Sequence, residues 1–128
     1  MTMLAPISAN APAVHFDPEP FHVAASRELA AYPLVAPGVC FNPMCSRDFA
    51  PKRPWQLYCC EVCRKVGEVE MRKVGHKAAP ALLAWRMGKY ERDDTALRDL
   101  SKAGRNYVSN LQSAWWNDRR ARAERGRA

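Results

Sequence analysis

The chain has 128 residues and a mass of 14.4 kDa, and its 20 Lys and Arg outnumber its 13 Asp and Glu, which gives a net charge of +7. A chain of this length has room for one ordinary domain, or for a very small domain with arms, so a large catalytic core is not expected. No stretch approaches the ~18 apolar residues of a membrane-spanning helix, and the N-terminus lacks the basic and apolar parts of a secretory signal. We therefore expect a cytoplasmic protein without membrane contact, with its cysteines in a reducing compartment.

Charge and composition divide the chain into three segments. Residues 1–39 carry a net charge of −2, residues 40–76 carry +3, and residues 77–128 carry +6. We interpret these segments as a Pro/Ala-rich extended arm, a zinc finger, and a two-helix C-terminal region that ends in a basic arm. The expected fold is therefore mainly α, with a small treble-clef-like finger followed by a helical hairpin.

The first segment contains six of the ten prolines. Each proline fixes its own φ angle and pushes the preceding residue out of the α region, so long helices are excluded here. A short helix within residues 23–32 is possible, because this stretch is rich in Ala and Leu. We expect the rest of the arm to be extended.

All five cysteines lie in one short stretch of the second segment, at Cys40, Cys45, Cys59, Cys60 and Cys63. Zinc takes four thiolates at the corners of a tetrahedron, and two short pairs separated by a loop satisfy this geometry. The alternative, free buried thiols, is disfavoured because the segment is too short and too rich in proline to bury them. Cys59 and Cys60 compete for the place of the third ligand, and spacing alone slightly favours Cys60, because Cys60 and Cys63 form a CxxC pair.

The stretch from Phe49 to Arg64 reads F-x-P-x-R-P-x-Q-x-Y-C-C-x-x-C-R. It resembles the treble-clef zinc fingers of small bacterial proteins, in which the cysteine directly after the aromatic residue binds the metal and the next residue, a Ser, caps the helix. The resemblance covers about 25 residues and extends to MYND fingers and to a small gyrase-inhibiting zinc protein, which bind proteins; similar fingers also occur in nucleic-acid-binding proteins. It implies one structural zinc ion held by Cys40, Cys45, Cys59 and Cys63, with Cys60 at the Ser position.

A catalytic role is not expected. Catalytic zinc keeps a position open for water, whereas four thiolates close the site. Treble-clef nucleases need a histidine base and a second metal ligand on the finger, but His15 and His22 lie in the arm and His76 follows the finger helix. We find no nucleophile constellation, phosphate loop or carboxylate pair. The sequence therefore predicts a protein that is not an enzyme.

Three helices are expected after the cysteines. The first runs from Glu61 to about Val74 and ends at Gly75, and the second runs from Pro80 to Tyr90. The core face of the second helix is expected at Leu82, Leu83, Trp85 and Met87. Asp94 is expected to cap a third helix of about 25 residues. The apolar row of this third helix has helical spacing and consists of Leu97, Leu100, Gly104, Tyr107, Val108, Leu111 and Trp115.

Basic side chains recur along the finger and the helices. Such side chains displace counterions from nucleic-acid phosphates, and a pI near 9.5 is typical of this use. The candidate nucleic-acid contacts are Lys52, Arg53, Arg64, Lys65, Arg72, Lys73, Arg98, Lys102, Arg105, Arg119, Arg120 and Arg122.

These features favour a zinc-stabilised nucleic-acid-binding protein, with DNA binding in transcription regulation as the leading interpretation. The alternative is a protein–protein adaptor or inhibitor that docks through the finger and the helix bearing Trp115 and Trp116, with a polymerase or topoisomerase as its target. Trp115 is expected in the core and Trp116 on the surface. Neither the oligomeric state nor the recognition sequence follows from the sequence.

Overall fold

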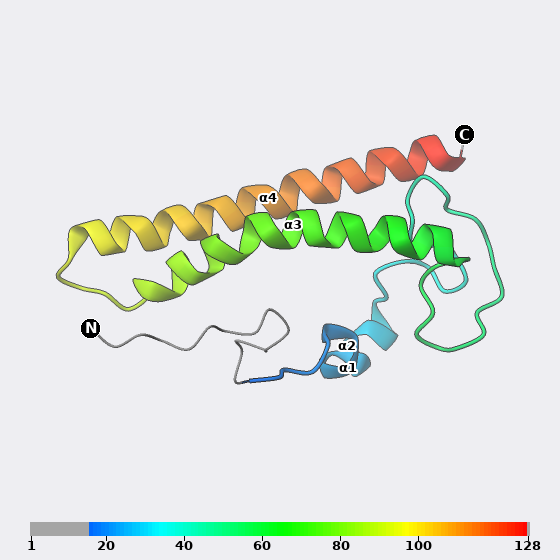
Figure 1. Cartoon of the computed structure of the whole chain (residues 1–128), viewed down its shortest axis with the longest axis horizontal. Helices are drawn as coiled ribbons and strands as arrows, with labels where there is room; N and C mark the ends of the chain where they lie inside the picture. Colours follow the sequence, from blue (N-terminus) through cyan, green and yellow to red (C-terminus); the bar gives the residue numbers. More distant parts are fainter. Residues whose placement is uncertain (1–15, 128) are drawn as a thin grey trace, which may run out of the picture. The chain divides into compact units, whose positions relative to one another are not determined.

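The computed structural model describes residues 16–127, which are mainly α-helical (Figure 1). The chain divides into two compact units, one that ends at Leu34 and one that begins at Val35. The first unit contains the short helices α1 (Phe21–Ala24) and α2 (Ser26–Ala31). The second unit contains the long helices α3 (Glu61–Met87) and α4 (Thr95–Arg127). Among the described residues, no helix is long and apolar enough to cross a membrane.

The first unit is more helical than an extended arm. The short helix expected within residues 23–32 forms as two pieces separated at Ala25, whose φ and ψ of −113° and 32° leave the helical region. Neither piece contains a buried residue. The part of the predicted arm at residues 1–15, with His15, lies outside the described residues.

Helix α3 is continuous where the sequence predicts two helices. It begins at Glu61, as expected, but passes through Gly75 and Pro80 and ends only at Met87, with Gly88 as its C-cap. The predicted helix end at Gly75 is therefore wrong. A proline inside a helix removes one hydrogen bond and crowds the carbonyl four residues earlier, at a cost of ~3 kcal/mol. The packing of α3 along α4 offsets this cost.

Helix α4 is longer than expected. Asp94 accepts a hydrogen bond from the backbone N–H of Leu97 at 3.1 Å, so the predicted N-cap is correct. The helix then spans 33 residues rather than about 25, because it continues through the arginine-rich C-terminal stretch. The predicted basic arm is therefore the last part of a helix. Salt bridges of this stretch to α3 stabilise that extension.

The two long helices run antiparallel and pack side by side (Figure 1). Their closest approach is at glycines: a Cβ on Gly104 would lie 2.5 Å from the carbonyl oxygen of Ala81, and one on Gly88 would lie 2.4 Å from that of Leu97. Ser101 beside them is buried and donates a hydrogen bond to the carbonyl oxygen of Trp85 at 2.6 Å. Small residues thus form the helix–helix contact.

The core face expected for residues 80–90 is therefore largely wrong. Leu82 is 49% exposed, Leu83 is 69% exposed and Met87 is 63% exposed, whereas Trp85 is half-buried. The apolar row predicted on α4 fares better: Gly104 is buried, Leu100 and Tyr107 are exposed, and the other four are half-buried, namely Leu97, Val108, Leu111 and Trp115. Among residues 16–127, the buried apolar side chains are those of Cys40 and Cys63, together with Pro43 between the first two cysteines.

Residues 35–60 form an irregular loop region against the start of α3. Strand structure in this region is limited to one antiparallel bridge between Val39 and Asp48. The N–H of Cys40 donates to the carbonyl oxygen of Arg47 at 2.8 Å, and the N–H of Phe41 donates to that of Leu57 at 2.7 Å. These bonds bring the first and second cysteine pairs together.

Candidate metal centre

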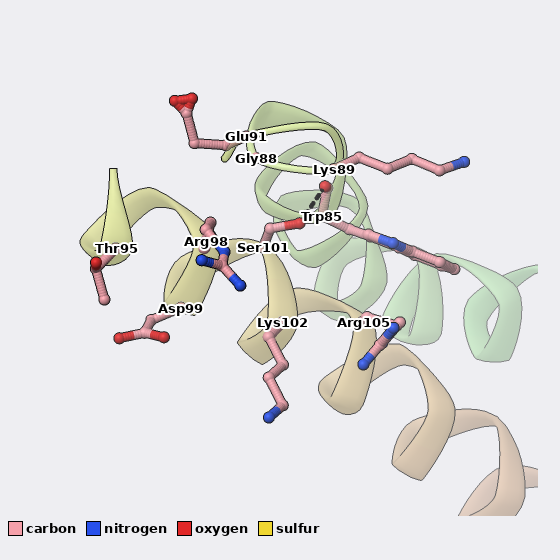
Figure 2. Close-up of a pocket in the computed structure, with 10 residues that line it drawn as sticks. All are labelled: Trp85, Gly88, Lys89, Glu91, Thr95, Arg98, Asp99, Ser101, Lys102 and Arg105. Carbon is pink, nitrogen blue, oxygen red and sulfur yellow. Dashed lines mark hydrogen bonds between the residues drawn. The ribbon is translucent and has the colours of Figure 1, made fainter. Parts of the chain in front are cut away.

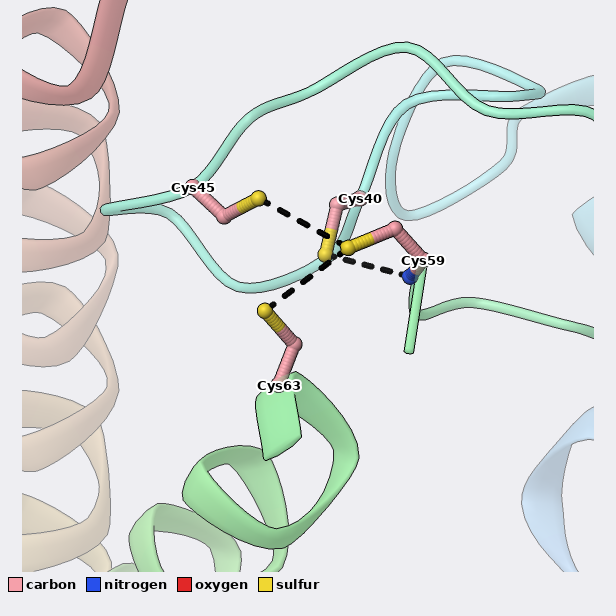
Figure 3. A group of neighbouring side chains, drawn as sticks. All are labelled: Cys40, Cys45, Cys59 and Cys63. Carbon is pink, nitrogen blue, oxygen red and sulfur yellow. Dashed lines mark hydrogen bonds between the residues drawn. The ribbon is translucent and has the colours of Figure 1, made fainter. Parts of the chain in front are cut away.

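Four cysteines converge where the loop region meets the first turn of α3. The sulfur atoms of Cys40, Cys45, Cys59 and Cys63 all lie within 4.8 Å of one another (Figure 3). Cys40 is 1% exposed and Cys63 is 8% exposed. These are the four cysteines that the resemblance implies as ligands.

The sulfur–sulfur distances suit a tetrahedral metal ion. The Sγ of Cys59 lies 3.8 Å from the Sγ of Cys45 and 3.8 Å from the Sγ of Cys63. A tetrahedron with metal–sulfur bonds of ~2.3 Å has edges of about 3.8 Å. A disulfide requires about 2.05 Å between the sulfurs, and all five cysteines are free. The four cysteines can therefore hold one metal ion.

A tight turn positions the first cysteine pair. The side-chain oxygen of Asn42 accepts a hydrogen bond from the N–H of Met44 at 3.2 Å. The backbone carbonyl oxygen of Asn42 accepts one from the N–H of Cys45 at 2.9 Å. Ser46 follows with a φ of 46°, in the left-handed region, and its hydroxyl donates to the carbonyl oxygen of Pro43 at 2.8 Å. Asn and Pro both favour this turn. The Asn side chain accepts a hydrogen bond from the backbone two residues later, and Pro has a fixed φ.

Two hydrogen bonds point at the sulfurs themselves. The amide nitrogen of Asn42 donates to the Sγ of Cys63 at 3.3 Å, and the backbone N–H of Cys59 donates to the Sγ of Cys40 at 3.4 Å. Donors around a ligand atom orient it and stabilise its negative charge. The site therefore has outer contacts of the kind that support bound metal.

The thiols cannot all ionise easily on their own. Burial raises the pKa of Cys63 to about 11, and burial together with the neighbouring thiols raises the pKa of Cys59 far above its usual range. At Cys45 burial acts in the same direction, but hydrogen bonds from the backbone of Arg47 and from the other thiols outweigh it and lower the pKa. Thiolates crowded together need a cation to neutralise them, and a metal ion held by the four cysteines would supply that charge.

The fifth cysteine stands apart from the four. Cys60 is exposed and occupies the N-cap position of α3 with extended backbone angles, φ −156° and ψ 171°. Its side chain makes no capping hydrogen bond, although the nearby N–H of Cys63 lowers the pKa of its thiol. Cys59 rather than Cys60 therefore joins the cluster, as the resemblance implies.

One carboxylate ties the end of α4 to α3 near the metal centre. Glu70 on α3 is 17% exposed and accepts a hydrogen bond from the indole N–H of Trp115 at 3.0 Å. It also pairs with Arg119 and, at 2.6 Å, with Arg122. Burial alone would raise the pKa of Glu70, but the bonds from Arg122 and Trp115 and the charge of Arg119 lower it.

Arg119 and Arg122 are therefore engaged within the chain. Arg119 is 16% exposed and Arg122 is 19% exposed. The Nε of Arg122 lies 2.8 Å from Asp118 but is not aligned for a hydrogen bond. Arg120, the third basic residue predicted in this stretch, is exposed.

On the first turns of α3, the predicted basic residues have acidic neighbours. Arg64 pairs with Glu68 at 2.5 Å and with Glu61 at 3.4 Å, and Lys65 lies 3.8 Å from Glu61. These pairs are solvent-exposed, where ion pairs contribute little to stability. Four other predicted contacts are exposed as well: Lys52, Arg53, Arg72 and Lys73.

An open pocket of about 630 Å³ lies at the far end of the helix pair, between the end of α3 and the start of α4 (Figure 2). Three of the predicted nucleic-acid contacts line it. Arg98, Lys102 and Arg105 line it from α4, and Trp85 and Lys89 line it from the other side. The remaining lining residues are Gly88, Glu91, Thr95, Asp99 and Ser101. Within the part of the chain that the structure describes, none of these four cations forms a salt bridge.

Sequence reasoning missed two residues that support the metal centre, Asn42 and Glu70. The sequence marks Asn42 only as a turn former, and its bond to the Sγ of Cys63 depends on the folded loop. Glu70 lies seven residues after Cys63 and three residues after Gly67. In a helix this spacing places all three residues on one face. That spacing is the signal from which Glu70 could have been found.

Comparison with known proteins adds no further constraint. No family model, no curated protein and no solved structure matches the chain. The functional conclusion therefore rests on the chain's own geometry, namely a four-cysteine metal centre beside a pair of long helices, whose far end carries four cations without a salt bridge among the described residues.

Proposed function

We propose that the chain is a zinc-stabilised nucleic-acid-binding protein, a cytoplasmic DNA-binding regulator rather than an enzyme. The observation that carries this proposal is the group of exposed cations Lys89, Arg98, Lys102 and Arg105 on one side of the helix pair. Exposed cations on a rigid helix gain free energy from phosphates by releasing condensed counterions. Contacts of this kind position a protein on nucleic acid without reading its sequence.

The metal in this proposal is zinc in a structural role. Tetrahedral sites of four thiolates select zinc or iron–sulfur chemistry, and a single closed site of this size suits one zinc ion. A turn that carries Cys40 and Cys45, followed by a helix start that carries Cys59 and Cys63, supports a treble-clef-type finger. Four protein ligands leave no open position for a substrate, so the finger acts as a scaffold.

The proposal divides the predicted basic residues by their surroundings. Arg119 and Arg122 hold Glu70, so their role is structural. Arg98, Lys102 and Arg105 carry the phosphate contacts, with Arg120 and the other exposed cations as weaker contributors. Trp85 is half-buried beside the pocket, and its backbone carbonyl oxygen accepts the hydrogen bond from the Ser101 hydroxyl.

A binding titration with a matched charge control tests the proposal. The variant R98Q/K102Q/R105Q and the control R27Q/K77Q/R92Q each lose three positive charges, and both sets are exposed. Fluorescence anisotropy with labelled duplex DNA, single-stranded DNA and RNA should show at least a tenfold weaker affinity for the first variant only. For duplex DNA the parent chain should show a salt slope near −0.9 per phosphate contact.

One outcome would overturn the proposal, and another would overturn only the contacts assigned to the pocket. If the parent chain binds no nucleic acid at low salt, the chain is not a nucleic-acid-binding protein. If both variants lose affinity equally, net charge alone explains the binding and the pocket has no special role. A binding loss that depended strongly on DNA sequence would instead assign base reading to these residues.

One observation favours the adaptor as a second candidate. Trp116 is 59% exposed on α4, while the neighbouring Trp115 bonds to Glu70. Exposed tryptophan is enriched at the centres of protein interfaces. A pull-down from native lysate with and without nuclease separates the two candidates: a partner retained after nuclease treatment and lost in W116A supports the adaptor.

A further inference from the structure

Each long helix carries an exposed row of eight residues that the metal centre and the basic pocket do not use. Along each row the residues are alternately four and three positions apart in the sequence. Contact residues have this sequence spacing in helices that pack on one another. The row of α3 consists of Val62, Val66, Val69, Lys73, His76, Pro80, Leu83 and Met87. The row of α4 consists of Ala96, Leu100, Ala103, Tyr107, Asn110, Ala114, Asn117 and Ala121. All sixteen residues are exposed.

The two rows lie on the same side of the helix pair. Residues two apart in a helix point in nearly opposite directions, because each residue turns the helix by 100°. Trp85 faces the basic pocket, so Leu83 and Met87 face away from it. In the same way Arg105 lines the pocket (Figure 2), so Ala103 and Tyr107 point away. The rows therefore share the face opposite the basic pocket.

Contacts between the helices also fix the level of each row residue along the pair. Gly88 lies against Ser101, and Trp115 bonds to Glu70. A residue of α3 and a residue of α4 therefore lie at the same level along the pair when their residue numbers add up to about 187. The level pairs include Met87 with Leu100, Leu83 with Ala103, Lys73 with Ala114 and Val66 with Ala121.

This register makes the two rows complementary at several levels. The α3 row carries a large side chain opposite Ala at Leu83 and Ala103, at Lys73 and Ala114, and at Val66 and Ala121, whereas Met87 and Leu100 are both large. Within one chain the rows lie side by side on one face and cannot cover each other. A second copy, rotated by a twofold axis parallel to the helices, would place its α4 row on the first copy's α3 row at the same levels.

Charge favours the same arrangement. Lys73 is the one Lys or Arg in the two rows. If α3 packed on α3, Lys73 would face Lys73 or His76 of the other copy. If α3 packs on α4, Lys73 faces Ala114, and the carboxylate of Asp118, which pairs with Arg122 and is 60% exposed, lies one turn away at the same end. Two like charges are thereby kept apart, and each copy contributes to both contacts.

We propose that this apolar face binds a second copy of the chain, so that two helix pairs form an antiparallel four-helix bundle with α3 of each copy on α4 of the other. The sixteen row residues of each copy approach the ~20–30 residues that one partner contributes to a standard interface. The basic pockets then lie on the two outer faces of the dimer. The inference goes beyond the proposed function and does not depend on it.

The test measures the mass of the metal-loaded, nuclease-treated full chain by light scattering after size-exclusion chromatography. The parent chain should have twice the 14.4 kDa of one copy. L83E should reduce the mass to that of one copy, because it places a charge in the row. The control L82E introduces the same charge on the neighbouring residue, which is 49% exposed and outside both rows, and should remain dimeric.

A charge pair tests the α3-on-α4 arrangement directly. L83K alone and A103E alone should each be monomeric. An equimolar mixture of the two variants should recover the dimer, since the lysine introduced in one copy would then meet the glutamate introduced in the other. Circular dichroism and metal content confirm that each variant is folded.

Each contrary result has a defined meaning. A monomeric parent chain at all concentrations overturns the proposal and leaves the face to a different protein. Dissociation by L82E as well as L83E contradicts the assigned face. If L83E dissociates the dimer but A103E does not, or if the mixture stays monomeric, α3 does not pack on α4 of the second copy.

Discussion

The guanidinium of Arg119 donates a hydrogen bond of 2.5 Å to the carbonyl oxygen of Phe41, and it lies 4.2 Å from the centre of the Phe41 ring. Phe41 directly follows the candidate metal ligand Cys40. Gly126 closes against the same loop, since a Cβ there would lie 2.6 Å from the carbonyl oxygens of Pro43 and Met44. The C-terminal turns of α4 thus hold the loop that carries the first cysteine pair.

Arg119 should therefore matter for stability, and its neighbour Arg120 should not. R119Q loses the bonds to Phe41 and Glu70 and should lower the free energy of unfolding by about 2 kcal/mol, the scale of hydrogen bonds to charged groups. R120Q removes the same charge from an exposed position and should change it by less than about 0.5 kcal/mol. Urea unfolding of the metal-loaded protein measures both. Equal effects of the two variants would contradict a stabilising role for the contacts of Arg119 with Phe41 and Glu70.

Stability should fall in acid partly through Glu70. Arg122, Trp115 and Arg119 hold the pKa of this carboxylate below its usual value in spite of its burial. A lowered folded-state pKa means that the contribution is fully present above the unfolded pKa of ~4.3 and is lost as the pH falls through the folded-state value. E70Q should therefore be less stable than the parent chain above a pH of about 5, with a difference that shrinks towards a pH of about 3.

Metal release in acid acts on both proteins, so the informative quantity is the difference between the parent chain and E70Q. E61Q is the matched control, because Glu61 is exposed and pairs only with exposed Arg64 and Lys65 among the described residues. At neutral pH its stability should differ from that of the parent chain by less than about 0.5 kcal/mol, because exposed ion pairs contribute little. A parent-minus-E70Q difference that stayed constant from neutral pH to a pH of about 3 would rule out the ionised Glu70 network.

Two glycines in the long helices should respond in opposite directions to alanine. A Cβ at Gly104 would lie 2.5 Å from the carbonyl oxygen of Ala81 and 2.8 Å from the backbone nitrogen of Trp85, and backbone atoms of α3 cannot move without separating the helices. G104A should therefore destabilise the protein by ~1–3 kcal/mol.

Among the residues that the structure describes, a Cβ at Gly75 meets no atom within 4 Å. G75A should stabilise by ~0.5–1 kcal/mol, because alanine restricts the unfolded chain and favours helix. Thermal unfolding compares the two variants. A stabilising G104A would show that the helices do not approach closely at this glycine.

Local sequence was informative where local chemistry determines the structure. Paired cysteines can be recognised without tertiary contacts, and the N-cap at Asp94 depends only on a side chain and a backbone N–H three residues away. Spacing alone slightly favours Cys60 over Cys59, whereas Cys59 is the one in the cluster. The difference arises because the Sγ of Cys59 lies among the other sulfurs, whereas Cys60 is the N-cap of α3 and is exposed to solvent.

Tertiary contacts determined what the sequence did not reveal. Gly75 and Pro80 indicate a helix end, but packing along α4 keeps α3 continuous. Large apolar residues such as Leu83 were expected in the core, but small residues such as Gly104 allow the helices to approach closely and leave the large ones exposed. Arg119 has the pattern of a solvated arginine until its partner Glu70, 49 residues away, is brought beside it.

Removal of the metal should unfold the loop region and loosen the start of α3. Structural zinc supplies ~10–16 kcal/mol of apparent binding free energy in small fingers, far more than a core of two cysteines and one proline can replace. A strong chelator should reduce the helical circular dichroism signal and remove hydrogen-exchange protection from residues 40–75. An unchanged spectrum and melting temperature with chelator would contradict a structural metal.

Metal content of single cysteine variants tests the central claim most directly. The parent chain, C59S and C60S are purified with zinc under reducing conditions, and bound metal is measured by mass spectrometry. One zinc per chain is expected for the parent chain and for C60S, because Cys60 faces solvent, whereas C59S should lose most of its zinc, because the cluster then lacks its third thiolate. Full zinc in C59S together with loss in C60S would contradict this metal centre, and so would a parent chain that binds no metal.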